Sequence, residues 1–334
     1  MNGPAEFSIP KYTVHDVGSV HALSQLYPQN VKDYDAPTIW KSTRGKGVVV
    51  MVIDSGCPKN HRDLAPNLDM PRCRSFVAGE DIYDTYVGHS THCCGTIGAV
   101  DNSVGIVGIA PEVTLITAKV LNKYGSCTST ELINSLRYAQ QIKPDVINLS
   151  LGSENSIPGL QDILRELVQS GTVIIGSSGN NGENKILYPA AYDEVIAVGS
   201  YKTLADKQRS TFSSWGPSLD IMGPGEEILS TYLNEGYAVL SGTSMAAPSI
   251  SGIVALLIAY YKSKGKRLTV DEVKALLYVN VVDVGDFGRD DTFGWGFVNS
   301  VKLFSTVYAP PKMVSIPKKP NIIQKFFKRL FKRR

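Results

Sequence analysis

The 334-residue chain lacks the features that mark membrane and secreted proteins. No apolar run in it reaches the ~20 residues that span a bilayer. Its first residues, MNGPAEFSIPKY, contain neither the basic stretch nor the apolar stretch of a signal peptide. Cysteines are few, and five at scattered positions do not make a disulfide framework. We therefore expect a cytoplasmic protein whose thiols are reduced.

Acidic residues are absent from the last part of the chain. Residues 311–334 carry nine Lys or Arg and no Asp or Glu, which leaves 25 basic and 31 acidic residues in 1–310. The body of the protein is therefore mildly acidic, and its charge gives no support for nucleic-acid binding. With 43% hydrophobic residues, the chain can bury a full core.

The basic end reads as a separate appendage. A proline-rich linker, PPKMVSIPKKP, precedes IIQKFFKRLFKRR, in which apolar residues recur every three or four positions between Lys and Arg. On a helix this spacing separates an apolar face from a cationic one. We expect residues 309–334 to bind an anionic membrane or an acidic partner, so that the protein is peripheral at the membrane. The alternative for this segment is a solvated basic tail. The sequence leaves open whether the protein forms a homodimer.

The body shows the alternation typical of an α/β fold. Short β-rich runs occupy 47–54, 114–121, 145–151, 172–178 and 195–200, with helix-like stretches between them. Runs buried on both faces and separated by helices predict a parallel sheet with right-handed crossovers. A helix is predicted over 129–142, where Thr128 and Glu131 form a capping box and Pro144 lies just beyond the end. Helices are also expected after Ser244 and over 269–279.

Three polar residues lie where such a sheet places its chemistry. Asp54 closes the first strand, Asn180 follows a strand in a small-residue turn, and Ser244 stands where a glycine-containing turn gives way to a helix. Ligands gather at the carboxyl ends of parallel strands. Each residue also has a structural interpretation, as a turn aspartate, a turn asparagine or an N-cap serine.

The stretch GHSTHCCGT, residues 88–96, adds two histidines and two cysteines. His89, His92, Cys93 and Cys94 are all competent zinc ligands, so a zinc site is one interpretation. A catalytic base with buried neighbours is the other, because most unpaired cysteines behave as small apolar residues.

Together, VIDSG, GHSTHCCGT, SSGNNG and GTSMAAP resemble the motifs of the subtilisin-like serine proteases, the peptidase S8 family, over roughly residues 25–300. The Asp, His, Ser order along the chain is that of subtilisin. This resemblance implies a three-layer α/β/α fold with a mainly parallel central sheet. It also implies a catalytic triad of Asp54, His89 and Ser244, with Asn180 in the oxyanion hole. His92 would then pack or form hydrogen bonds, and Ser90 replaces the glycine that the family motif has after the catalytic histidine.

The resemblance implies two further sites. A peptide substrate would add a strand along Ser150, Leu151 and Gly152, while Ser178 and Gly179 line the P1 pocket and Leu187 at its base makes it shallow. The stretch VDNSVGIVGIAP resembles the calcium loop of the family. Its implied ligands are the side chains of Asn102, Asp63 and Gln25 and the carbonyls of Val100, Val104 and Ile106. A plain hydrophilic turn is the alternative.

The N-terminal stretch EFSIPKYTV resembles that of intracellular subtilisins, in which such an extension crosses the active site. Lys11 between Pro10 and Tyr12 makes the match partial, and a disordered terminus is the alternative. The expected organisation is an extension over 1–22, which would be inhibitory, a peptidase domain over 23–308 and the tail over 309–334. Function is then expected to be intracellular serine endopeptidase activity, or else peptide binding by a catalytically impaired relative.

Overall fold

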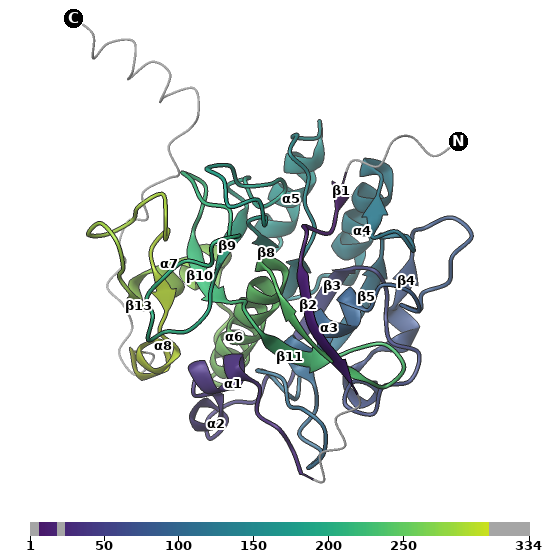
Figure 1. Ribbon diagram of the computed structural model, residues 1–334, viewed down its shortest axis with the longest axis horizontal. Coiled ribbons are helices and arrows are strands. Elements are labelled where there is room, and N and C mark those ends of the chain that lie inside the picture. Colours follow the sequence, from purple (N-terminus) through teal and green to yellow (C-terminus); the bar gives the residue numbers. More distant parts are fainter. Residues whose placement is uncertain (1–6, 19–23, 307–334) are drawn as a thin grey trace, which may run out of the picture.

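A nine-stranded sheet organises the part of the chain that the structure describes, residues 7–18 and 24–306 of this computed structural model (Figure 1). All neighbouring strands are parallel except the pair β13 and β14 at one end. In spatial order the strands are β13 (Val281–Val282), β14 (Phe297–Val298), β10 (Ile221–Pro224), β9 (Val195–Tyr201), β8 (Val173–Ser177), β7 (Val146–Leu149), β3 (Val49–Asp54), β5 (Thr114–Lys119) and β4 (Arg74–Ser75). The mainly parallel central sheet is confirmed. The tail over 309–334 lies outside the described residues.

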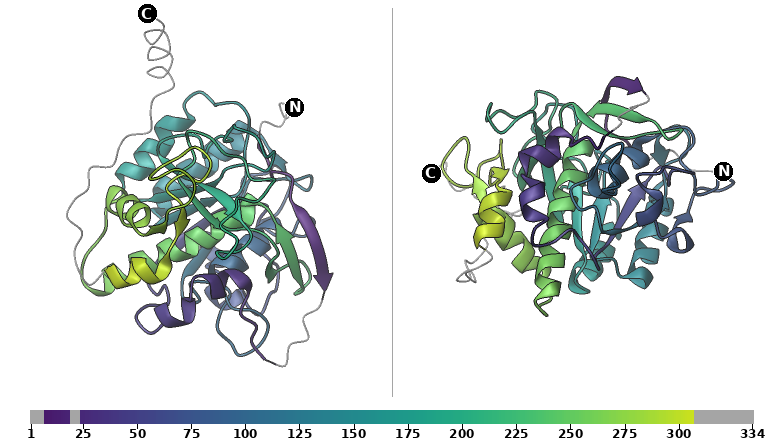
Figure 2. Two further views of the ribbon diagram at one scale, coloured as in Figure 1. Left: turned by 60° about the vertical axis from the view of Figure 1, so that its left-hand side comes forward. Right: turned by 90° about the horizontal axis from the view of Figure 1, so that it is seen from below.

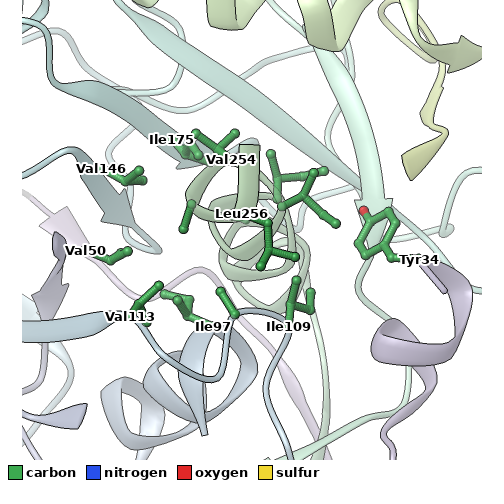
Figure 3. Close-up of a cluster of buried hydrophobic side chains, with 14 of the residues drawn as sticks. Tyr34, Val50, Ile97, Ile109, Val113, Val146, Ile175, Val254 and Leu256 are labelled. Carbon is green, nitrogen blue, oxygen red and sulfur yellow. The ribbon is translucent and has the colours of Figure 1, made fainter. Parts of the chain in front are cut away.

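Helices cover both faces of this sheet. Because successive strand residues point to opposite faces, Val50 and Val52 join one buried cluster while Met51 and Ile53 join the other. The first cluster includes helices α3 (His89–Gly98) and α6 (Thr243–Ser263), and the second includes α4 (Ser129–Ile142) and α5 (Leu160–Gln169). Figure 3 shows Val254 and Leu256 of α6 among side chains from the strands and from α3. The protein therefore has the three layers expected from the resemblance.

The sequence analysis found no apolar run long enough to span a bilayer, and helix α6 shows that this was wrong. The most apolar 18 residues of this 21-residue helix have a mean hydropathy of 1.6, so by length and composition it could cross a membrane. An apolar run of spanning length therefore does exist in this chain. The most apolar 18-residue window of α6 is, however, 100% buried inside the protein. A helix that is apolar all round belongs in a core when other elements surround it, and here both the sheet and α3 pack against it.

Helix α4 has its predicted bounds, α7 (Val270–Val279) begins one residue later than predicted, and α6 begins at Thr243, so that Ser244 lies inside it. Helix α4 begins after Thr128, whose hydroxyl accepts from the Glu131 N–H while the Glu131 carboxylate accepts from the Thr128 N–H. The same capping box, Thr269 with Glu272, starts α7. The sequence analysis gave no bounds for α5, which lies between two predicted strands. It did not anticipate α1 (Gln29–Asp33), α2 (Ala36–Ile39), α8 (Ser300–Thr306) or the 3₁₀ turns η1 (Ala65–Asn67) and η2 (Met70–Arg72).

Two further sheets hold the N-terminal segment against the body. Strand β2 (Thr13–Gly18) pairs antiparallel with β12 (Tyr237–Ser241), which pairs with β11 (Ile228–Thr231). Strand β1 (Phe7–Ser8) pairs antiparallel with β6 (Ser126–Cys127). Figure 1 shows β1 and β2, in purple, running across one face of the molecule, and in both views of Figure 2 β2 lies at the periphery beside a green strand. We call residues 7–18 the strap.

Candidate active site

Asp54 and His89 form a buried pair at the carboxyl end of the sheet. Asp54 is the last residue of β3 and His89 the first of α3. The His89 Nδ1 lies 3.0 and 2.9 Å from the two carboxylate oxygens of Asp54, and neither side chain is exposed. An Nδ1–H donated to the carboxylate leaves Nε2 as the free basic nitrogen. This is the arrangement of a carboxylate that orients a general base.

Backbone geometry fixes where His89 stands. Gly88, which precedes α3, has φ of 74°, and a Cβ there would lie 2.4 Å from the ring of Tyr232. Asp84 accepts hydrogen bonds from the Gly88 N–H, at 3.0 Å, and from the Thr91 hydroxyl, at 3.2 Å. A carboxylate in this place satisfies N–H groups at the first turn of a helix. Asp84 is therefore a positioning residue that sequence analysis did not identify.

Ser244 is the second residue of α6 and is fully buried. Its hydroxyl donates to the Ser150 carbonyl at 3.3 Å. The His89 Nε2 atom is also buried and has no hydrogen-bond partner within the described part of the chain. The Ser244 to His89 hydrogen bond of an active triad is thus not formed in this conformation. Catalytic hydrogen bonds are often loose until substrate is bound, so this geometry does not exclude a triad.

Pro248 explains how the backbone of Ser244 is held. A proline inside a helix has no N–H to give to the carbonyl four residues earlier, and that carbonyl belongs to Ser244. The Ser244 carbonyl accepts instead from the Ser150 hydroxyl at 3.0 Å and from the Cys93 thiol at 3.5 Å. Cys93 lies one helical turn after His89, so this contact brings the starts of α3 and α6 together.

Asn180 stands beside the start of α6 with a fixed orientation. Its Oδ1 accepts from the Thr243 N–H at 2.9 Å and from the Thr243 hydroxyl at 2.7 Å. The amide nitrogen is thereby turned outward, and it donates to the carbonyl of Lys11 at 2.8 Å. An amide held in this way can donate to a carbonyl oxygen that gains charge. The carbonyl that it contacts in this structure is an ordinary peptide carbonyl of the strap.

The strap lies between two backbone edges as an added strand. On one side Phe7 is opposite Cys127, and the Ile9 N–H donates to the Gly125 carbonyl at 3.0 Å. On the other side Ser8 and Gly152 exchange two hydrogen bonds of 3.0 and 2.9 Å. The edge that was predicted to bind a peptide therefore binds a segment of this chain, by strand addition.

The strap also contacts His89 and the end of β12. The Tyr12 ring lies 5.2 Å from that of His89, and the His15 Nε2 lies 2.6 Å from the Ser241 hydroxyl. Burial is the first cause that raises the pKa of the Tyr12 hydroxyl, followed by its neighbour Tyr232. Phe7 is only 1% exposed and Pro10 is buried, so the first part of the strap packs into the body, whereas the residues of β2 are all exposed.

Leu187 lies between Gly152 of the predicted peptide-binding edge and Gly179 of the predicted P1 pocket. A Cβ on Gly152 would lie 2.8 Å from the Leu187 side chain, and so would one on Gly179. The Leu187 N–H donates to the Ser178 carbonyl at 3.0 Å, and the side chain is buried. Leu151 is buried as well. Leu187 therefore fills the space that the absent glycine side chains leave.

The histidine and cysteine cluster does not assemble as one zinc site. His92 Nε2 points to the carbonyls of Ile228 and Ala238, at 2.9 and 3.2 Å, and burial lowers its pKa to about 3. Burial also raises the pKa of the Cys93 and Cys94 thiols. Zinc binds thiolates, and a protonated buried thiol is inert.

One group of potential metal ligands lies at the start of α3. The ligating atoms of Asp54, His89 and Cys93 lie within 4.8 Å of one another, but Asp54 and His89 already pair with each other.

Ser90 is the residue that departs from the family motif. It is fully buried, and its N–H donates to the Ser55 hydroxyl at 3.0 Å. Its side chain therefore packs inside the protein and does not line the predicted peptide-binding groove.

The predicted calcium residues gather in one place. The buried Asp63 carboxylate accepts from the Asn102 amide at 2.9 Å, the Ile106 N–H at 3.0 Å and the Tyr237 hydroxyl at 2.7 Å. The Gln25 amide donates to the Val100 carbonyl at 3.4 Å. Val104 closes the turn by donating its N–H to Asn102 Oδ1 at 3.1 Å. All six residues thus belong to one loop and its immediate neighbours.

Comparisons with known proteins agree with this geometry. A family model described as the subtilase family matches residues 45–296. The chain is similar to the intracellular serine protease of Paenibacillus polymyxa, with 35% identity over 299 residues, which is 86% of this chain and 90% of that protein. It is 38% identical over 287 residues to the major intracellular serine protease of Bacillus subtilis (strain 168), covering 83% and 88%. Subtilisin DY of Bacillus licheniformis is 37% identical over 260 residues, covering 77% and 90%.

Proposed function

We propose that Asp54, His89 and Ser244 are the catalytic triad of this chain, which belongs to the subtilase family and is therefore a serine endopeptidase. We propose also that the enzyme acts in the cytoplasm. The observation that carries the assignment of the triad is the hydrogen bond from Asn180 to a backbone carbonyl of the strap. This carbonyl lies beside the start of α6, and we infer that a substrate carbonyl would bind there in the same way.

The roles follow from the contacts. His89, oriented by Asp54 through Nδ1, takes the proton of Ser244 at Nε2. The Ser244 oxygen attacks the substrate carbonyl and forms an acyl-enzyme, which water then hydrolyses. The Asn180 amide and the Ser244 N–H donate to the oxyanion. Removing one such side-chain donor costs ~10²–10³ in turnover in subtilisin, and we expect a loss of this size in Asn180→Ala.

A second candidate function is peptide binding without cleavage. It is favoured by one observation, namely that the Ser244 hydroxyl is bonded to Ser150 and not to His89. In that case the groove would hold a peptide by strand addition while the acyl-enzyme never forms.

Labelling with a fluorophosphonate distinguishes these candidates, because the reagent reacts with an activated serine. We expect labelling of a chain that begins at residue 24, which lacks the strap, and none of its Ser244→Ala or His89→Ala variants. His92→Ala should lower stability more than labelling. If this chain is folded and binds peptide but is not labelled, the binding function is supported instead.

We propose further that the strap over residues 7–18 is inhibitory. Ser8 takes the backbone position opposite Gly152, and Pro10 follows two residues later. A proline has a fixed φ and no N–H, so it can hold the chain in a register that is not cut. The carbonyl bound at Asn180 is that of Lys11, and Tyr12 covers His89. A substrate peptide cannot occupy the groove while these contacts last.

Calcium is proposed as a structural ion at the loop around Asn102. The residues present fit it in kind, since calcium takes carboxylate, amide and carbonyl oxygens, and Asp63 is a buried carboxylate among two side-chain amides. Gly105 has φ of 61°, and a Cβ there would lie 2.2 Å from Asp63 Oδ2, so the backbone of this loop lies close to the Asp63 carboxylate. Asp63, Asn102 and Gln25 would hold the ion with three carbonyls, and both amides would have to turn their oxygens inward.

A further inference from the structure

Lys119 is a buried charge that the proposed mechanism does not use. It is the last residue of β5, and its side chain is only 4% exposed. Lysine is almost never buried to this degree unless its ammonium is paired. In the sheet Lys119 lies opposite Asp54, the last residue of the neighbouring strand β3 (Figure 1). The ammonium therefore belongs to the end of the sheet that carries the proposed triad.

The ammonium has two partners in the segment over 80–84. Its Nζ donates to the Tyr83 carbonyl at 2.9 Å and lies 3.1 Å from a carboxylate oxygen of Glu80. The other Glu80 oxygen accepts from the Lys123 N–H at 3.3 Å. Hydrogen bonds from an ionised donor are roughly twice as strong as neutral ones. Lys119 therefore holds this segment from the side of β5.

The backbone after β3 holds the same segment from the other side. The Cys57 N–H donates to the Ile82 carbonyl at 2.9 Å, and the Cys57 carbonyl accepts from the Asp84 N–H at 2.7 Å. A Cβ on Gly56 would lie 2.3 Å from the Ile82 oxygen, so the two backbones are in close contact. The position of Asp84 is thus set by contacts with both β5 and the end of β3.

Asp84 passes this position on to His89. Its carboxylate accepts from the N–H groups of Val87 and Gly88, at 3.3 and 3.0 Å, and from the Thr91 hydroxyl at 3.2 Å. These groups lie before and after His89 in the chain. A displacement of the Asp84 carboxylate therefore moves the first turn of α3.

We propose that Lys119 is a positioning residue for His89. Its ammonium holds the Tyr83 carbonyl, and Asp84, the next residue, holds the first turn of α3. Without the ammonium this carbonyl loses its charged donor, and the imidazole loses its alignment with Asp54. A misplacement of about 1 Å can cost ~10²-fold in rate. The effect on catalysis rests on the proposed function, in which His89 is the general base.

Lys262 offers a matched control, although it is more exposed. Its Nζ also donates to a backbone carbonyl, that of Gly47 at 3.0 Å, and pairs with a carboxylate, that of Asp145 at 2.7 Å. Gly47 and Asp145 precede strands β3 and β7, so this lysine lies at the opposite end of the sheet from His89. Lys262→Met therefore removes the same kind of contact without touching the segment over 80–84.

The alignment of His89 is tested by nuclear magnetic resonance of the full-length Ser244→Ala chain, which cannot digest itself. The ring N–H that His89 donates to Asp54 gives a proton resonance far downfield, and His89→Gln identifies it by its loss. We expect Lys119→Met to shift and broaden this resonance, Lys119→Arg to keep it, and Lys262→Met to leave it unchanged.

A second variant covers the case in which Lys119→Met does not fold. Lys119→Gln keeps a polar N–H group on a shorter side chain without the charge, and we expect it to shift the same resonance. Melting temperatures are recorded for every variant. A lower melting temperature with an unmoved resonance would overturn the proposal, because Lys119 would then only stabilise the fold.

The effect on catalysis is measured in the chain that begins at residue 24, since the strap would mask it in the full chain. Thermal melting first shows whether this chain folds, and if it does not, the resonance decides alone. We expect Lys119→Met to lower kcat and kcat/KM alike, by roughly tenfold or more, and Lys262→Met to change neither. An unchanged kcat would overturn the coupling to catalysis. If the unmodified chain folds but hydrolyses no peptide, the proposed function fails, whereas the resonance still decides the positioning.

Discussion

Leu187 shows how one side chain sets the depth of the predicted P1 pocket, because it fills the space between Gly152 and Gly179. We expect peptides with a small or medium P1 residue to be cut faster than those with Phe or Tyr. Leu187→Gly should reverse this order, since burying a large apolar side chain is worth ~1.5–3 kcal/mol, or roughly one to two decades in kcat/KM. A panel of P1-substituted peptides measures this, with Leu187→Met as the volume-matched control. A profile led by aromatic P1 residues in the unmodified enzyme would contradict it.

His92 gives stability a pH dependence of known sign. Burial lowers its pKa to about 3, below the ordinary value of 6.5. Between these values the unfolded chain takes up a proton that the folded chain refuses, so the free energy of unfolding falls as the pH falls. The contribution of His92 is complete above about pH 6.5. Denaturant unfolding of the Ser244→Ala chain should therefore show a steeper loss from pH 6.5 downward than the same chain with His92→Gln. Equal slopes would refute this explanation.

At the residue scale, sequence reasoning found the residues that stand in short motifs. Asp54 and His89 pair as predicted from the resemblance, and Asn180 donates to a carbonyl. It could not find the role of Asp84 or the hydrogen bonds by which Thr243 orients the Asn180 side chain, because both depend on the tertiary structure. The Ser244 carbonyl is the intermediate case. Pro248 shows in the sequence that this carbonyl loses its helical partner, but only the fold supplies Ser150 and Cys93 in its place.

At the scale of elements, the strap makes a direct prediction. A chain beginning at residue 24 loses β1 and β2, which occupy the groove and cover His89. We expect it to hydrolyse small peptides faster than the full chain, and to be inhibited by an added peptide of residues 7–18. Specific activity per labelled serine corrects for any loss of folding. Equal activity of the two forms would mean that the strap does not gate the site.

The loop around Asn102 gives the second prediction at this scale. A ligand that binds only the native state stabilises it by ~2.7 kcal/mol at a hundredfold excess over its dissociation constant. Calcium should therefore raise the melting temperature of the full-length Ser244→Ala chain, and a chelator should lower it. Asp63→Asn should remove this response, whereas Asp101→Asn, a change at an exposed neighbouring carboxylate, should keep it. An unchanged melting curve in chelator would dismiss the ion.

The helices and strands differ in how clearly the sequence predicts them. Helix α4 has its predicted bounds because a capping box starts it and Pro144 follows its end. Strand β2 gave no signal, since all six of its residues are exposed and its partner β12 is more than 200 positions away along the chain. Only tertiary pairing makes it a strand, as is usual for sheets.

At the scale of the whole molecule, the body and the tail have net charges of opposite sign. The mildly acidic body and the basic tail over 309–334 predict that the full chain co-sediments with anionic vesicles, more weakly at high salt. Truncation after Tyr308 should abolish co-sedimentation and leave hydrolysis of small peptides intact. Vesicles of neutral lipid are the control. Equal binding by the truncated chain would rule out the tail as anchor, and lost hydrolysis would make it part of the fold.

Helix α6 is the most apolar long helix in the described part of the chain, and it is buried on all sides. Its place in the order of synthesis fits this burial. Strands β3, β7, β8, β9, β10 and β12 and helix α3, which pack against it, all precede it in the chain. When α6 leaves the ribosome, the surfaces that receive it have already been made, which shortens the time an aggregation-prone segment spends in water. A nascent chain that acquires α6 thus gains Ser244, the proposed nucleophile, together with the helix that fills much of one buried cluster.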